Sequence, residues 1–289
     1  MRRQKLQAEK KSQKGINMAL KAYIEILRPL NCLMAAIATF IGYAVSVQAI
    51  SFTLPVFYAM LSAFLICGAG QTINDFFDLK IDRKLRPEKP LSSGKIRPQA
   101  ALIYSIALFA LGNISAFIAG FTPLIIALIF TALLIVYSAV LAKLKYVGNW
   151  VVAAGTAFTL IFGASISGNY SIVIFFAVAA LFANVSRELI KDLEDISADK
   201  GFKQTLPIVL GKNAAKSFAY SFYFIAAAVS YIAAVNFNLP ISYVLIVSIA
   251  NLGFVYSAFL ASKNNFSKAQ QASKAAMVFA LIAFLSVIF

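Results

Sequence analysis

The sequence predicts an all-α membrane protein, with nine transmembrane helices in a bundle around an apolar cavity and two Asp-rich motifs at its cytoplasmic mouth. Hydrophobic residues make up 61% of the 289 positions and charged residues only 13%, and the mean hydropathy is +0.82. This balance excludes a soluble globular domain. The apolar residues fall into stretches of spanning length, and the 11 acidic residues include two matched triplets of aspartates.

Nine apolar stretches are long enough to cross a bilayer. We expect these spans at residues 23–48, 55–74, 99–119, 122–142, 148–167, 170–187, 214–236, 239–261 and 271–289. The preceding residues 1–22 form a basic segment, and 23–289 form a single membrane domain. The first 17 residues are basic and polar, so we expect no cleavable signal peptide.

All 26 Lys and Arg residues, and all the acids, fall on one side of this nine-span arrangement. The positive-inside rule places that side in the cytoplasm. We therefore expect a multi-pass protein of the cell membrane, with its N-terminus and active-site loops cytoplasmic and its C-terminus on the outer side. The net charge of +15 then reflects topology and attraction to anionic lipid headgroups, and no nucleic-acid partner is expected.

Two residue types narrow the chemistry further. His is absent, which excludes imidazole bases and His-metal sites. The two cysteines, Cys32 and Cys67, lie in apolar runs and are interpreted as small buried hydrophobes. Neither a disulfide framework nor a thiolate metal site is expected.

Two acidic clusters share one spacing, i, i+3, i+7, which on a helix places three carboxylates on one face. They follow the second and sixth spans and consist of Asp75, Asp78, Asp82 and of Asp192, Asp195, Asp199. Like charges roughly 6 Å apart repel by about 3 kcal/mol at an effective dielectric near 20. Six carboxylates placed in this way therefore indicate a bound divalent cation.

The two clusters match beyond their aspartates. An offset of 117 residues also takes Gln71 to Glu188, Arg83 to Lys200, Pro90 to Pro207, Gly94 to Gly211 and Lys95 to Lys212. A single acidic triplet is common on a solvated helix face. The shared register instead favours duplicated units that build one site at their interface.

The donor set favours a particular ligand. Carboxylate oxygens without His or thiolate suit hard cations, Mg²⁺ first, and Mg²⁺ completes its shell with water and phosphate oxygens. Six carboxylates and a diphosphate repel each other, so binding needs two or three Mg²⁺ and nearby cations. Arg83 and Lys200 directly follow each third aspartate. We therefore expect a metal-bound diphosphate with an apolar tail, the tail lying in the bundle and the charge of the departing diphosphate being stabilised at the mouth.

At these residues the chain resembles the UbiA superfamily of intramembrane prenyltransferases. The segment from Asn74 to Asp82 has the family form NDxxDxxxD, and the segment from Asp192 to Asp199 has the form DxxDxxxD. The Arg28-Pro29-x-Asn31 run, and Tyr137 followed by Lys143 and Lys145, also match. The resemblance implies that the substrate is a prenyl diphosphate and that the six aspartates hold Mg²⁺–diphosphate.

The remaining candidate residues follow from the same motifs and from the charged loops. We take Asn74, Tyr137 and Lys143 as catalytic, and as substrate-binding Arg28, Asn31, Arg83, Lys145, Lys191 and Lys200. Structural explanations stay open for three of them. Tyr137 also suits an interfacial aromatic belt, Arg28 a topogenic charge, and Asn31 a hydrogen bond between helices.

Three stretches look like the archaeal digeranylgeranylglyceryl phosphate synthases within this superfamily: Arg86 to Gly94, Lys143 to Asn149, and Arg187 to Asp195 leading to Thr205-Leu-Pro207. This resemblance implies transfer of a geranylgeranyl group to the free hydroxyl of geranylgeranylglyceryl phosphate, a lipid-like acceptor. Another acceptor (a chlorophyllide, a quinone-precursor ring or haem) is the alternative within the superfamily. A transporter is the alternative outside it, and it would place ionisable residues near the bilayer midplane.

Overall fold

The computed structural model describes residues 20–140, 145–201 and 204–289. In this part of the chain the structure is helical without strands, and nine helices are long and apolar enough to cross a membrane. They are α2 (Pro29–Val47), α3 (Leu54–Phe77), α5 (Pro98–Ala119), α6 (Phe121–Ala139), α7 (Lys145–Ala164), α8 (Ser171–Glu194), α11 (Lys212–Asn236), α12 (Ile241–Ser262) and α13 (Phe266–Ser286). The predicted fold class is confirmed.

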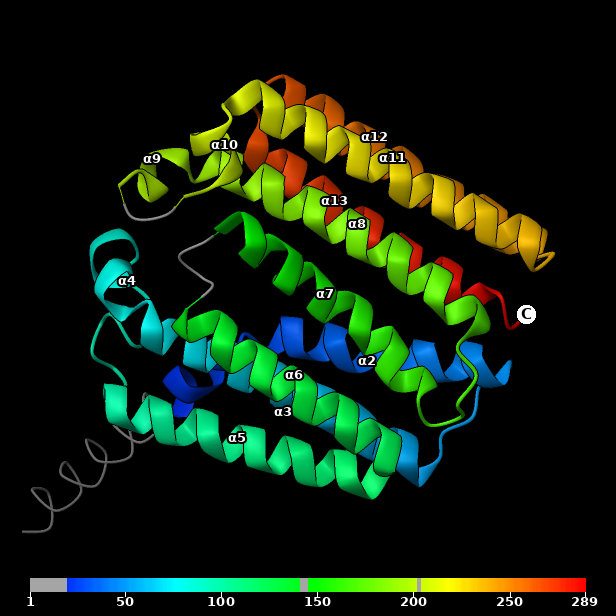
Figure 1. Cartoon of the computed structure of the whole chain (residues 1–289), viewed down its shortest axis with the longest axis horizontal. Helices are drawn as coiled ribbons and strands as arrows, with labels where there is room; N and C mark the ends of the chain where they lie inside the picture. The colour runs from blue at the N-terminus through cyan, green and yellow to red at the C-terminus, as the bar shows by residue number, and fades with distance from the viewer. Residues whose placement is uncertain (1–19, 141–144, 202–203) are drawn as a thin grey trace, which may run out of the picture.

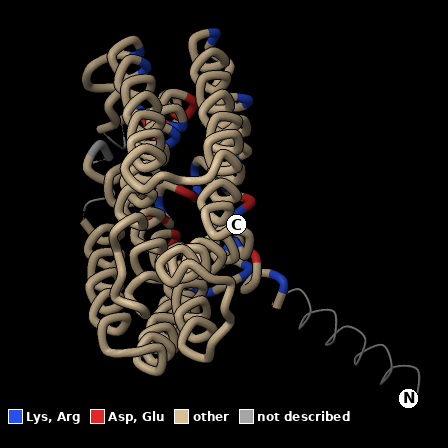
Figure 2. The backbone as a smooth tube through the Cα atoms, turned by 90° about the vertical axis from the view of Figure 1, so that its right-hand side faces the viewer, with Lys and Arg blue, Asp and Glu red and all other residues tan. Residues whose placement is uncertain are grey.

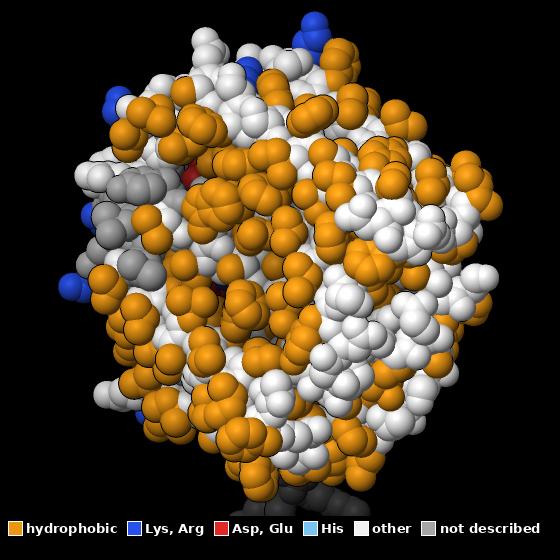
Figure 3. All heavy atoms as spheres, turned by 45° about the vertical axis from the view of Figure 1, so that its right-hand side comes forward, with side chains coloured by type: hydrophobic (Ala, Val, Ile, Leu, Met, Phe, Trp, Pro, Cys, Tyr) orange, Lys and Arg blue, Asp and Glu red, His pale blue; other side chains and the backbone are white. Residues whose placement is uncertain are grey.

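Three short helices lie together at one end of the bundle (Figure 1), namely α4 (Leu79–Leu85), α9 (Ile196–Asp199) and α10 (Leu206–Val209). The long helices run between this end and the short connections at the other. Figure 2 views the bundle from its right-hand side in Figure 1, and the Asp and Glu residues, drawn in red, lie toward the centre of the molecule in this view. Hydrophobic side chains cover much of the outer face (Figure 3), as expected for helices that face lipid.

The bundle has two halves that pack on each other through α2 and α7. In the first half α3 packs against α2, α5 and α6, and in the second α8 packs against α7, α11 and α13. A Cβ atom on Gly163 would lie 1.9 Å from the carbonyl oxygen of Thr39, and one on Gly42 would lie 2.0 Å from that of Leu160. Only glycine allows the two backbones to approach this closely, as in other membrane helix pairs.

The start of the first span differs from the prediction, which placed it at residue 23. Residues 20–27 form a separate helix, and α2 begins at Pro29. Arg28 between them adopts the left-handed conformation, with φ 50° and ψ 67°, and the proline that follows disfavours the right-handed helical conformation at this residue, so the helix does not continue through it. The separate helix buries Ala22 and Ile26 in one cluster with Leu91 and Ile96, so it fixes Arg28 beside the loop after α4.

Candidate functional site

The two acidic segments have the same backbone geometry. The second-span helix α3 ends at Phe77 and the sixth-span helix α8 at Glu194, and each is followed by one nearly helical aspartate and a short helix. That aspartate has φ −81° and ψ 1° at Asp78, and φ −85° and ψ 4° at Asp195. The 117-residue repeat seen in the sequence is therefore also a repeat of structure.

The repeat extends to burial and to the glycines that follow. The first and third aspartates of each segment are buried, with exposures of 3% and 5% for Asp75 and Asp82 and of 0% and 6% for Asp192 and Asp199. The middle aspartate is half-buried in both segments. Gly94 and Gly211 occupy matching turns at φ 76° and φ 87°, a region that favours glycine.

Cations neutralise the first segment. Arg28 Nη2 donates to Asp75 Oδ1 at 2.8 Å, and Lys89 Nζ donates to the same oxygen at 3.0 Å. The Lys89 ammonium also lies 2.6 Å from Asp82 Oδ2. Lys89 thus bridges the two buried carboxylates of this segment, which would otherwise repel each other without solvent to separate them.

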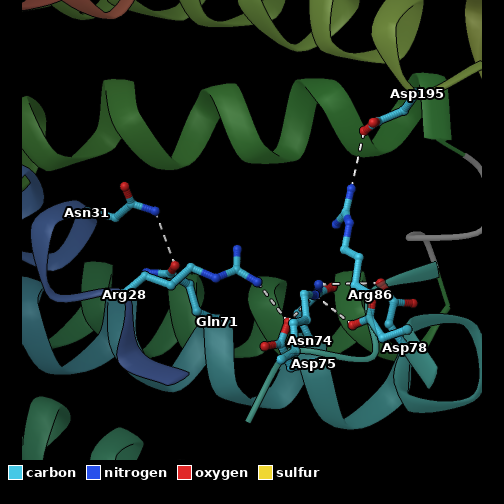
Figure 4. Close-up of polar contacts among 10 residues, drawn as sticks. Arg28, Asn31, Gln71, Asn74, Asp75, Asp78, Arg86 and Asp195 are labelled. Carbon is cyan, nitrogen blue, oxygen red and sulfur yellow. Dashed lines mark hydrogen bonds and ion pairs between the residues drawn. The ribbon is translucent and has the colours of Figure 1, made fainter. Parts of the chain in front are cut away.

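The second segment contacts both another helix and the first segment. Asn149 Nδ2, on α7, donates to Asp192 Oδ2 at 2.7 Å. Arg86 Nη2, just after α4, lies 3.3 Å from Asp195 Oδ2, and Figure 4 shows its side chain extending from one acidic segment to the other. This ion pair joins the residue after α4 to the second acidic segment.

The remaining predicted site residues differ in burial and in their partners. Asn31 donates to Gln71 Oε1 at 3.2 Å near Arg28 (Figure 4). Tyr137 is half-buried near the end of α6. The Nζ atom of Lys191 lies 3.9 Å from Glu188 Oε2. The side chains of Arg83 and Lys200 are exposed. Lys143 lies outside the described residues, and Lys145 is the first residue of α7.

Two cations of the loop after α4, Arg86 and Lys89, also lie against aspartate carboxylates. The sequence places them in the same charged loop as Arg83. Position directly after a third aspartate, which favours Arg83 and Lys200, does not select them. The chain turns between Arg86 and Lys89, where the Lys89 amide donates to the Arg86 carbonyl at 3.3 Å, and the contacts of Lys89 with the aspartates join residues seven and fourteen positions apart. The signal was present in the Arg86-Pro87 and Lys89-Pro90 pairs, which mark a compact turn.

The residues present fit a divalent metal by their donor chemistry. In the described part of the chain, no three carboxylates converge on one point. However, the Lys89 ammonium shows that a cation fits between Asp75 and Asp82. Beside them, Asn74 Oδ1 is buried and lacks a hydrogen-bond partner in the structure as described. A buried amide oxygen without a hydrogen-bond partner, next to carboxylates, is a suitable ligand for Mg²⁺ or another cation that prefers oxygen donors.

A half-open apolar pocket of about 530 Å³, here called the apolar cavity, lies beside the second segment. Its walls come from α7, α8, α10 and α11 and include Trp150, Val185, Leu189, Leu206 and Phe222, with Asn149 as a polar wall residue. Val185 and Leu189 share a helix face with Asp192, seven residues after Val185. The cavity wall therefore continues along α8 to the acidic segment.

Together these features define a multi-pass α-helical membrane protein that carries two matched acidic segments at one end of an apolar bundle. The sequence model that describes the UbiA prenyltransferase family matches residues 35–287 of this chain. The chain belongs to this family of membrane enzymes.

Curated relatives and solved structures agree with the assignment. The digeranylgeranylglyceryl phosphate synthase of Methanothrix thermoacetophila is 38% identical over 91% of this chain and 97% of its own, and that of Thermococcus kodakarensis is 35% identical over 93% and 98%. A solved structure from work on digeranylgeranylglyceryl phosphate synthase in membranes is 30% identical, with a TM-score of 0.79, over 93% of this chain and 98% of that one. A UbiA homolog from Archaeoglobus fulgidus, bound to GPP and Mg²⁺, shares the fold at 19% identity and a TM-score of 0.67, over 92% and 99%.

Proposed function

We propose that this protein transfers the geranylgeranyl group of geranylgeranyl diphosphate to the free hydroxyl of geranylgeranylglyceryl phosphate. The product carries the second ether bond of an archaeal membrane lipid. The structural observation that carries the proposal is the ion pair between Arg86 and Asp195, because it joins two duplicated acidic segments into one polar mouth above an apolar bundle. Relatives with the corresponding synthase name, at 34–38% identity, support the choice of substrates.

The acidic segments are the proposed binding site for the diphosphate and its metal. Mg²⁺, when bound, neutralises diphosphate oxygens and stabilises the charge that grows on the leaving group. The residues that would hold it are the six aspartates, with Asn74 Oδ1 as a neutral oxygen donor. Oxygen donors alone, without sulfur or imidazole, match the preference of this ion.

Basic side chains at the mouth supply the rest of the charge balance. Arg28 and Lys89 both form ion pairs with the Asp75 carboxylate in this structure. With Mg²⁺ held by these carboxylates, the Arg28 and Lys89 side chains would be available to phosphate oxygens at the same place. Arg86 lies between the two segments, where a guanidinium can hold a phosphate in a bidentate manner. We assign these three residues to the diphosphate or to the phosphate of the acceptor.

The apolar cavity beside Asp192 is the proposed place for an isoprenoid chain. Its aromatic and aliphatic walls exclude water, which protects an allylic cation from hydrolysis after the C–O bond to the diphosphate breaks. The acceptor oxygen then bonds to the allylic carbon, and its proton passes to a carboxylate or to the released diphosphate. The chain has no His to take that proton.

We further propose that the mouth faces the cytoplasm, since the positive-inside rule applies to the loops around it. A cysteine-accessibility experiment on Arg83→Cys and Asn169→Cys in intact cells tests this orientation, in a background with both native cysteines replaced by serine. A membrane-impermeant maleimide is expected to label position 169 and not position 83 until the cells are opened. Labelling of position 83 in intact cells would reverse the orientation.

An acceptor screen tests the function itself. Purified protein would be given labelled geranylgeranyl diphosphate, Mg²⁺ and either geranylgeranylglyceryl phosphate, 4-hydroxybenzoate, a naphthoate or a chlorophyllide. We expect product with geranylgeranylglyceryl phosphate alone, and none after chelation of the metal. Faster transfer to an aromatic acceptor would refute the assignment.

A further inference from the structure

The two cysteines of the chain lie side by side between two transmembrane helices. Cys32 is on α2 and Cys67 is on α3, both are free thiols, and the side-chain amide of one residue contacts both sulfurs. The amide nitrogen of Gln71 lies 3.7 Å from the sulfur of Cys32 and 3.3 Å from that of Cys67. The sequence led us to expect two unconnected hydrophobic side chains, 35 residues apart, but the structure forms a dithiol.

The packing of the two helices brings the sulfurs together. A Cβ atom added at Gly68, next to Cys67 on α3, would lie 2.7 Å from Leu27 Cδ2 and 3.5 Å from the sulfur of Cys32. The glycine therefore makes room for the Leu27 side chain beside the sulfurs, and the Gln71 amide contacts both of them. A disulfide needs Cα atoms about 4.4–6.8 Å apart, so formation of the bond tests whether the two helices reach this separation.

The two thiols contact residues that adjoin Arg28 and Asn31 at the acidic mouth. The Cys32 thiol donates to the carbonyl oxygen of Leu27 at 3.1 Å, directly before Arg28, whose left-handed conformation aims its guanidinium at Asp75. Gln71, which donates to both sulfurs, accepts from Asn31. A change at the sulfurs would therefore break the hydrogen bonds that position Arg28 and Asn31.

We propose that Cys32 and Cys67 are a modification site, a reversible dithiol–disulfide pair that lowers transfer when it is oxidised. A peroxide is the oxidant: the half-buried Cys67 thiol attacks one peroxide oxygen and becomes a sulfenic acid, with release of water or an alcohol. The Cys32 sulfur then displaces hydroxide from that sulfur, which leaves as water, and the S–S bond forms. Reducing thiols of the cytosol return the pair to the dithiol by exchange.

Formation of the bond is tested on the purified full chain in lipid nanodiscs. After treatment with hydrogen peroxide, free thiols are alkylated and tryptic peptides are analysed by mass spectrometry. The expected result is a peptide pair joined through Cys32 and Cys67 that dithiothreitol separates. In Cys32→Ser and Cys67→Ser proteins the link is expected to be absent. A sulfenic or sulfinic acid at Cys67 with Cys32 still open to alkylation, or no reaction at all, would overturn the proposal.

The effect on activity rests on the proposed function and is measured separately. Oxidised wild-type protein is expected to lose transfer by about ten- to a hundredfold, the scale of a misplacement near 1 Å, and to recover after reduction. Whatever rate each serine variant has before treatment, that rate is expected to be the same with and without peroxide. An intact rate in the cross-linked protein would refute the coupling. If the reduced protein transfers the geranylgeranyl group to none of the acceptors, the proposed function is wrong. Formation of the disulfide is still tested in that case, because it is measured separately by mass spectrometry of the linked peptides.

Discussion

The bridge made by Lys89 gives the sharpest prediction. Its ammonium lies 3.0 Å from Asp75 Oδ1 and 2.6 Å from Asp82 Oδ2, and its side chain is 17% exposed. Two unit charges at 3 Å attract by about 5 kcal/mol at an effective dielectric near 20, and desolvation of the ions offsets much of this attraction. Loss of one partner from a buried ion pair costs about 3–5 kcal/mol. With solvent reaching the ammonium, we expect Lys89→Met to lower metal-free stability by about 2 kcal/mol.

Thermal unfolding in detergent measures this loss, which corresponds to roughly 4–8 °C in Tm. Lys95→Met is the matched control, because Lys95 is exposed in the same loop. Since the ammonium no longer competes for the carboxylates, the Lys89 variant should also bind Mg²⁺ about tenfold more tightly, equivalent to about 1.4 kcal/mol. Magnesium should therefore stabilise this variant more than the wild type. Equal Tm values for the two variants, or weaker Mg²⁺ binding by Lys89→Met, would refute the reasoning.

Three further perturbations follow from the geometry. Asp192→Asn removes the charge of the carboxylate while keeping the shape of the side chain, so the rate of transfer should fall by at least about a hundredfold. Circular dichroism should be unchanged, and a near-normal rate would contradict the role of Asp192. Arg86→Met breaks the contact between the acidic segments, and we expect a higher KM for the diphosphate substrate, whereas an unchanged KM would remove Arg86 from the site. Gly163→Ala forces a methyl group against the Thr39 carbonyl and should lower stability by about 1–3 kcal/mol, measured by thermal unfolding; an unaltered Tm would show that α2 and α7 pack less tightly than described.

Much of the fold could be predicted because apolar length and charge placement act on whole segments. The nine spans and the single charged end follow from the cost of burying charge and unpaired backbone in lipid. The split at Arg28 is not predicted because residues 23–27 are apolar except for Glu25 and so join the first predicted span. Only the conformational restriction before Pro29 signals the break.

The site could be predicted where chemistry is carried by regular spacing, and less well where it depends on the loop. The aspartates are found by a helical repeat, and the common break at Asp78 and Asp195 preserves their register. The partners Lys89 and Asn149 come from a turn and from another helix, and helical periodicity does not predict such contacts. The pairing of Cys32 with Cys67 likewise depends on how α2 meets α3, which two apolar runs do not specify.

The central claim is that the two acidic segments form one magnesium–diphosphate site. Titration of purified protein with geranylgeranyl diphosphate, with and without Mg²⁺, tests it most directly through the binding stoichiometry. We predict one diphosphate bound per chain only with Mg²⁺, lost in Asp78→Asn and equally in Asp195→Asn, with no further loss in the double variant. Metal-independent binding, or one bound diphosphate retained after loss of either segment, would contradict the account.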